Sequence, residues 1–239
     1  MEEVEDPMSR VLPILFNADM VRTILDGRKT VTRRVVKGFI PRDSEFGYTA
    51  FTPKDHISCR GTFINGYGEK FFKLPCQRGD ILYVRETWAF IPCIGCDGKY
   101  NRGQAMNCYD LQAVEYDDGR SISDGCFVYR ADCRYPEKVS WSPSIHMPKQ
   151  AARIWLEVTD VRVERLQDMN TGDFLAEGVV IRPEAYNDPE NAYQQARKGF
   201  IDIWNSTVKK SEIDQYGWDA NPWVWTMEFE RGGKPEREE

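Results

Sequence analysis

Hydrophobic and polar positions repeat with two different periods along the chain, and together they predict short helices mixed with strands. Between Asn17 and Gly27, apolar residues recur with helical spacing, so we predict a short helix capped by Asn17. The β-branched run from Thr30 to Val36 predicts a strand directly after it, with Thr30, Thr32 and Arg34 on one face.

Four later stretches also have the pattern of strands: residues 81–88, 127–131, 154–164 and 223–230. In the third stretch the parity of the apolar positions changes near Thr159 and Asp160, which predicts a β-bulge. In the last stretch, Trp223, Trp225 and the apolar residues at 227 and 229 predict one strongly apolar face.

Two helices are expected between the last two strands. Thr171 is predicted to cap a short helix that Gly178 closes, which places Glu177 at the helix end. Asp188, followed by a proline, opens a longer helix. Its buried stripe is expected to contain Tyr193, Ala196, Phe200, Ile203 and Trp204.

This order of elements predicts an α+β protein, with a small β-barrel decorated by short helices. We expect one domain over residues 11–231, with insertions at about 38–77 and 91–126 and a disordered tail at 232–239. The first insertion is expected to be loop-like. A doubly wound sheet is disfavoured, because the βαβ rhythm, the G-x-G-x-x-G motif and the Walker loop are missing from the sequence.

Composition supports a folded, water-soluble chain. Of 239 residues, 41% are hydrophobic and 29% charged, which is enough apolar material to form a core. No apolar run approaches the roughly 20 residues of a membrane-spanning helix, and the acidic residues at 2–6 are unlike a secretory signal. We therefore expect a cytoplasmic protein that does not bind membranes.

Charge is distributed unevenly along the chain. The net charge is −6, yet residues 22–37 hold six basic side chains and one acid, a local charge of +6 − 1 = +5. This segment predicts an anion-binding surface that includes Lys29, Arg33 and Arg34. The alternative is a solvated strand edge whose charges discourage aggregation.

The chain contains seven cysteines, which we expect to be reduced thiols. Cys93 and Cys96 have the C-x-x-C spacing of a zinc knuckle, with a glycine inside the turn. With two of Cys108, Cys126 and Cys133 they predict one structural zinc ion. A second C-x-x-C pair is missing from the sequence, so unliganded thiols are the alternative.

Several separated blocks resemble one known family. The blocks are GRKTVTRR at 27–34, GDILYVRETW at 79–88, WSPSIHMP at 141–148, the segment 156–166 and LAEGV at 175–179. In this order they resemble the ASCH domains of bacteriophages and prophages, which are relatives of the PUA fold. The resemblance implies a PUA-like barrel with a cleft for RNA or a modified base, in a bacterial or phage-infected cell.

The resemblance also implies an activity. One branch of the family hydrolyses the amide of 4-acetylcytidine with a lysine and a threonine of a G-x-K-x-x-T motif and a later glutamate. Lys29 and Thr32 match the motif, and Glu177 lies where the glutamate is expected. The sequence is therefore similar to amidohydrolases that act on an acylated nucleoside or base and need no cofactor.

The chemistry of these residue types agrees with that role. A threonine hydroxyl needs a base, and an unprotonated lysine is such a base when neighbouring cations disfavour its charge. Arg28, Arg33 and Arg34 are neighbours of this kind, and Arg34 is a candidate donor to an oxyanion.

Two residues from another block are candidate ligand contacts. Trp141 is a candidate stacking surface for a base, and His146 a candidate contact to phosphate or a proton carrier. For both, a structural role is the alternative.

Two other functions stay open from the sequence. The first is a binding module that recognises RNA or a modified nucleotide without chemistry, in which Lys29 and Arg34 bind phosphate. The second is a ribonuclease. The sequence disfavours the ribonuclease, because it has neither a histidine pair near the motif nor carboxylates in a clear two-metal pattern.

Overall fold

The computed structural model describes residues 9–38, 45–48, 60–65, 68–92, 125–134 and 136–235. Its strands are β1 (Val11–Leu15), β2 (Val31–Val35), β3 (Glu45–Tyr48), β4 (Arg60–Asn65), β5 (Gly68–Lys73), β6 (Ile81–Arg85), β7 (Trp88–Pro92), β8 (Gly125–Tyr129), β9 (Trp155–Arg165) and β10 (Trp223–Gly232). Its α-helices are α1 (Ala18–Leu25), α2 (Thr171–Ala176), α3 (Pro189–Thr207) and α4 (Ile213–Tyr216). None of the described helices is long and apolar enough to cross a membrane.

The strands form three sheets, which confirms the α+β class. Five strands lie in the order β1-β6-β9-β10-β2, three in the order β3-β4-β5, and β7 pairs with β8. Ile81 donates its backbone N–H to Arg10 and Phe16 donates to Arg85, so β1 and β6 run parallel, whereas β10 and β2 pair antiparallel. In the described part of the chain the five-stranded order runs from β1 to β2 as an open series. The closed barrel stays a prediction.

The chain divides into two compact units, each assembled from separate stretches of sequence. The first unit comprises residues 1–10, 27–81 and 157–230, and the second comprises residues 11–26, 82–156 and 231–239. The order of the sequence blocks therefore does not follow the unit boundaries, because both units draw on the N-terminal and the C-terminal half.

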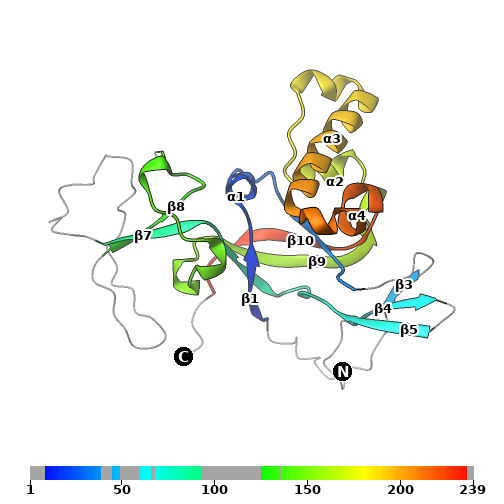
Figure 1. Cartoon of the computed structure of the whole chain (residues 1–239), viewed down its shortest axis with the longest axis horizontal. Coiled ribbons are helices and arrows are strands. Elements are labelled where there is room, and N and C mark those ends of the chain that lie inside the picture. The colour runs from blue at the N-terminus through cyan, green and yellow to red at the C-terminus, as the bar shows by residue number, and fades with distance from the viewer. Residues whose placement is uncertain are drawn as a thin grey trace, which may run out of the picture. The chain divides into compact units, whose positions relative to one another are not determined.

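The core of the first unit lies between β10 and the C-terminal helices. Figure 1 shows α2, α3 and α4 gathered on one face of β9 and β10. Ala192, Ala196, Phe200 and Trp204 of α3 pack in one cluster with Phe174 of α2. Val224 of β10 belongs to the same cluster. Trp225, Met227 and Phe229 are buried, which confirms the strongly apolar face predicted for β10. Because α2 and α3 cover Val224, the opposite face is buried there as well.

The stripe of buried residues along α3 differs at its edges from the predicted stripe. Ala196, Phe200 and Trp204 are buried as expected, but Ile203 is 37% exposed. The four buried residues of α3 are spaced by four, starting at Ala192, so Ile203 lies on the flank of that stripe.

The cap of α2 is Asn170, one residue before the predicted Thr171. The Asn170 side chain accepts a hydrogen bond from the backbone N–H of Asp173, and the Asp173 side chain accepts one from the backbone N–H of Asn170. This reciprocal pair is a capping box, which satisfies two otherwise unpaired donors at the helix start.

The cap can be tested with neighbouring substitutions. We expect Asn170→Ala to lower the free energy of unfolding by about 1 kcal/mol, because an N-cap side chain is lost. Thr171→Ala, which leaves the capping box intact, is expected to change it by less than half as much. Urea unfolding of both variants measures the difference, and an equal loss in the two would contradict the assignment of the cap.

The loop-like prediction for residues 38–77 needs correction. The stretch 38–77, expected to be loop-like, contains β3, β4 and β5, and the register pairs Asn65 with Gly68 at the end of the β4–β5 hairpin. The Asn65-Gly66 dipeptide between two β-forming runs is a hairpin signal that was overlooked. The described residues also continue through β10 to Gly232 and on to residue 235, into the predicted tail.

The predicted strand 81–88 is in fact two strands of different sheets. β6 ends at Arg85 because Glu86 leaves the ladder: its backbone N–H donates to the Met147 sulfur, at 3.2 Å. The Glu86 carboxylate is buried and accepts hydrogen bonds from Arg153 at 2.9 and 3.0 Å. β7 then starts at Trp88.

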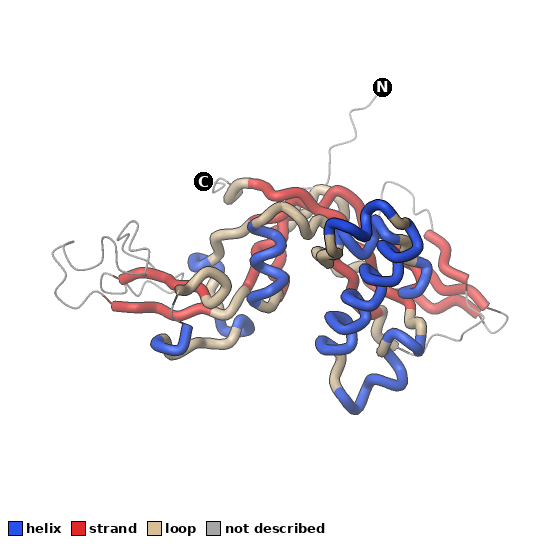
Figure 2. The backbone as a smooth tube through the Cα atoms, turned by 90° about the horizontal axis from the view of Figure 1, so that it is seen from above, coloured by secondary structure: helices blue, strands red, loops and turns tan. Residues whose placement is uncertain are grey.

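In the second unit, β7 and β8 lie side by side as a pair of strands (Figure 2). The pair is antiparallel, and Trp88 lies opposite Tyr129. Trp88 packs with Met147 and Ala151 in a small apolar cluster. The Arg153 guanidinium lies 4.0 Å from the centre of the Tyr129 ring. This unit thus has its own apolar cluster and its own buried ion pair.

Candidate functional site

The candidate site begins where the turn after α1 leads into β2. Gly27 has a positive φ of 72°, a conformation that glycine adopts without strain, and it redirects the chain toward Lys29. Lys29 forms an isolated antiparallel bridge with Glu177, and the neighbouring Thr30 N–H donates to the Ala176 carbonyl at 2.9 Å. Residues 148 positions apart in the sequence are therefore adjacent.

Glu177 is presented by the end of α2. It is the C-cap residue of the helix, and Gly178 follows with a positive φ of 93°, as the sequence predicted for the helix stop. The Glu177 residue is only 9% exposed. Its carboxylate is thus held at the helix end and directed into the protein.

Lys29 and Glu177 form a buried ion pair. The Lys29 side chain is fully buried, and its Nζ donates to Oε2 of Glu177 and, at 3.1 Å, to the Glu177 backbone carbonyl. Burial lowers the pKa of Lys29, and the charges of Arg34 and Arg33 lower it further, while Glu177 opposes the shift. The net direction is a lowered pKa, toward the neutral form that the sequence prediction requires.

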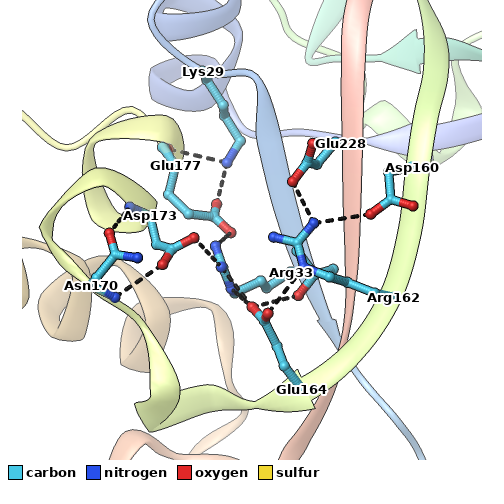
Figure 3. Close-up of polar contacts among 10 residues, drawn as sticks. Lys29, Arg33, Asp160, Arg162, Glu164, Asn170, Asp173, Glu177 and Glu228 are labelled. Atoms are coloured by element: carbon cyan, nitrogen blue, oxygen red, sulfur yellow. Dashed lines mark hydrogen bonds and ion pairs between the residues drawn. The ribbon is translucent and has the colours of Figure 1, made fainter. Parts of the chain in front are cut away.

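Arg33 joins this pair to two more carboxylates (Figure 3). Its Nη1 donates to Oε1 of Glu177 at 3.3 Å, its Nη2 to Asp173 at 3.1 Å, and its Nε to Glu164 at 2.8 Å. The Arg33 side chain is 1% exposed. β2, β9 and α2 are therefore linked by one buried guanidinium, and each of its nitrogen atoms has a carboxylate partner.

Glu164 connects this group to a second, more exposed layer. It accepts a hydrogen bond from the Thr226 hydroxyl at 2.8 Å and one from Nε of Arg162 at 3.2 Å. Arg162 in turn is paired with Asp160, at 3.1 Å, and with Glu228. Acidic and basic side chains thus alternate along β9, and Arg162 of β9 also pairs with Glu228 of β10 (Figure 3).

Thr32 is not in contact with the Lys29–Glu177 pair. It alternates with Arg33 along β2, so the two side chains leave the strand on opposite faces, and its register partner is Met227. Thr32 is buried, and no hydrogen bond joins its hydroxyl to another described residue. The structure brings together two of the three predicted catalytic residues.

The other basic residues of this segment are arranged in different ways. Arg28 is exposed and donates to the Gly178 carbonyl at 3.2 Å. Arg34 is half-buried; burial lowers its pKa and Glu177 raises it. Because Lys29 and Arg33 are buried and paired with carboxylates, these two cations do not form the accessible anion-binding surface that the sequence suggested.

Trp141 and His146 belong to the second unit. The Trp141 indole N–H donates to the Pro136 carbonyl at 2.7 Å, and the ring packs with Ala89 and Val128. His146 is exposed, in a short 3₁₀ turn. Their role as ligand contacts stays a prediction.

Most of the predicted zinc ligands lie outside the described residues. This holds for Cys93, Cys96 and Cys108 and for the side chain of Cys126, whereas Cys133 is half-buried. Cys76 is buried, and burial raises its pKa to about 12, so its thiol stays protonated at neutral pH. In the described part of the chain, no group of three or more histidine, cysteine or acidic residues is arranged to hold a metal ion.

Sequence reasoning missed the two carboxylates that hold Arg33. The sequence pattern places Asp173 inside a short helix and Glu164 at the end of a strand, without indicating a shared partner. The available signal was the position of Asp173 four residues before Glu177, which places both carboxylates on the same side of α2.

Comparison with known proteins gives no match. No family model matches the chain, no curated protein is similar to it, and no solved structure resembles it.

Proposed function

We propose that this protein is an ASCH-type hydrolase with a PUA-like barrel, which acts on an acylated, 4-acetylcytidine-like nucleoside or base. Support for the family comes from where its sequence blocks lie. The GRKTVTRR block contributes Lys29 and the LAEGV block contributes Glu177, and these two residues are bridged. The 156–166 block contributes Glu164, which pairs with Arg33.

The observation that carries the proposal is the buried Lys29–Glu177 pair. Lowering of the Lys29 pKa shifts this side chain toward the neutral form, which is the form that can accept a proton. Burial of the pair and the arginines beside it supply that shift.

The mechanism that the family resemblance implies is acyl transfer to Thr32 followed by hydrolysis. It requires the Thr32 hydroxyl to reach Lys29 once substrate is bound, because Thr32 and Arg33 lie on opposite faces of β2. Neutral Lys29 then takes the hydroxyl proton of Thr32 as its oxygen bonds to the acyl carbon of the substrate. The C–N bond to the exocyclic nitrogen then breaks, and the departing amine receives the proton from Lys29, with Glu177 stabilising the protonated lysine. Water cleaves the resulting ester, which releases acetate and restores Thr32. Arg34 supplies a donor for the oxyanion.

The proposal is tested by incubating the full chain with 4-acetylcytidine and measuring cytidine and acetate by chromatography. We expect equal amounts of the two products, formed in proportion to the protein concentration. Absence of any hydrolysis, together with retained binding of RNA or the intact nucleoside, would replace the hydrolase with the binding module. Cleavage of an RNA control would instead support the ribonuclease.

A further inference from the structure

Each oxygen of the Glu177 carboxylate has its own cationic partner. Oε2 accepts from Lys29 of the proposed reacting pair, and Oε1 accepts from Nη1 of Arg33 at 3.3 Å (Figure 3). A carboxylate held at only one oxygen can rotate about its last side-chain bond. Two separate partners fix its plane, so Arg33 determines how Glu177 meets Lys29.

Arg33 is itself held in one orientation by two carboxylates. Nε and Nη2 contact Glu164 at 2.8 and 2.6 Å, and Nη2 contacts Asp173 at 3.1 Å. The planar guanidinium fork suits this arrangement, because a lysine ammonium is a compact point charge without the fixed geometry. Glu164 comes from β9 and Asp173 from α2, so two elements fix the direction of the side chain.

The position of Arg33 also affects the electrostatics at Lys29. The charged groups that act on the Lys29 ammonium are Glu177 at the end of α2 and Arg33 and Arg34 of β2. The positive charge of Arg33 lowers the pKa of Lys29 directly. Arg33 also pairs with Glu177, the carboxylate that raises the pKa of Lys29. Both effects favour the neutral base.

We propose that Arg33 is a positioning residue of the hydrolase, which holds Glu177 in the orientation that the Lys29 base requires. This inference rests on the proposed function. It assigns a mechanistic role to a buried arginine outside the G-x-K-x-x-T motif. A merely structural Arg33 would contribute to stability, and Arg33→Lys, which keeps the charge, would then leave kcat unchanged.

The test measures the Lys29 titration and the hydrolysis rate in the same set of full-length proteins. Lysine labelled with ¹³C and ¹⁵N reports each ammonium by NMR, and the signal that disappears in Lys29→Arg is assigned to Lys29. Arg33→Met removes the charge, whereas Arg33→Lys keeps the charge without the fork. Arg162→Met is the matched control, because it breaks an ion-pair arginine of the same network that does not contact Glu177.

We expect Arg33→Met to raise the Lys29 pKa, because a neighbouring positive charge is lost. The base must be neutral, so the rising limb of the pH–rate profile should move to higher pH by the same amount. Arg33→Lys should leave that limb nearly in place and lower kcat roughly 100-fold, because Glu177 is misplaced. Arg162→Met should change neither quantity.

Unchanged Lys29 titration and unchanged pH–rate profile in a folded Arg33→Met protein would overturn the proposal and leave Arg33 structural. If Arg33→Met does not fold, a kcat of Arg33→Lys equal to wild type would overturn it in the same way. The NMR result is independent of substrate. A wild type without hydrolase activity would therefore refute the proposed function, and the titration would still decide whether Arg33 controls Lys29.

Discussion

Glu177→Gln is expected to lower the free energy of unfolding by about 3 kcal/mol, the range found when one partner of a buried ion pair is removed. Lys29 and Arg33 are both buried, and both lose the negative charge that they share. Chemical denaturation monitored by tryptophan fluorescence measures the loss. Asp19→Asn is a suitable control, since it breaks an exposed pair with Arg22 and is expected to cost well under 1 kcal/mol.

A double variant separates the loss of the pair from a general loss of packing. Lys29→Met together with Glu177→Gln should be more stable than Glu177→Gln alone, because the second substitution removes the unpaired buried charge. Arg33 keeps Glu164 and Asp173 in both proteins. Additive losses in the double variant would contradict a direct coupling between Lys29 and Glu177.

The destabilisation should also depend on pH. The pKa of Lys29 is lowered in the folded state from its ordinary 10.5, so folding excludes a proton that the unfolded chain binds. This cost is fully present below the folded pKa and disappears as the pH rises through it to about 10.5. Without Glu177 the pKa of Lys29 falls further, because Glu177 raises it. The loss caused by Glu177→Gln should therefore be larger at pH 6 than at pH 10.

The second large effect concerns catalysis. Lys29→Ala, Thr32→Ala and Glu177→Ala are each expected to lower kcat for hydrolysis of 4-acetylcytidine by about 10³-fold or more, because members of a cooperating set fail together. Thr32→Ser should keep part of the turnover, since it retains a hydroxyl. Thr30→Ala is the matched control: Thr30 is exposed, and its contact to Ala176 uses the backbone.

Thr32 gives this series its sharpest outcome. The structure places Thr32 and Arg33 on opposite faces of β2. Activity measurements on Thr32 variants therefore decide whether Thr32 is the nucleophile. If Thr32→Ala stays fully active while the other two variants fail, a water molecule activated by Lys29 and Glu177 is the nucleophile, and the threonine mechanism is wrong.

Local signals in the sequence predicted many elements correctly. Asn17 caps α1 and Asp188 caps α3, as expected, because capping depends on residues three or four positions apart. The ends of helices and strands were harder to predict from the sequence. β6 ends at Arg85 because the Glu86 backbone N–H leaves the ladder for the Met147 sulfur, a contact 61 residues away that no local pattern contains.

The candidate site was predictable only in part for a similar reason. The approach of Lys29 to Glu177 was expected from the resemblance between separated blocks. The burial of Lys29 and Arg33 was not, because a run of basic residues in a strand ordinarily indicates a surface. The three carboxylates that make burial tolerable come from positions 164, 173 and 177 and meet Arg33 only after β9 and α2 have packed.

Lys29→Arg tests the central claim most directly. Arginine keeps the positive charge beside Glu177 but does not lose its proton in the accessible pH range, so it preserves an ion pair and abolishes a base. We predict that wild-type protein releases acetate from 4-acetylcytidine and that Lys29→Arg, shown to be folded by circular dichroism, releases less than one thousandth as much per unit time. Equal rates in the two proteins would contradict the account, because the Lys29–Glu177 pair would then be structural.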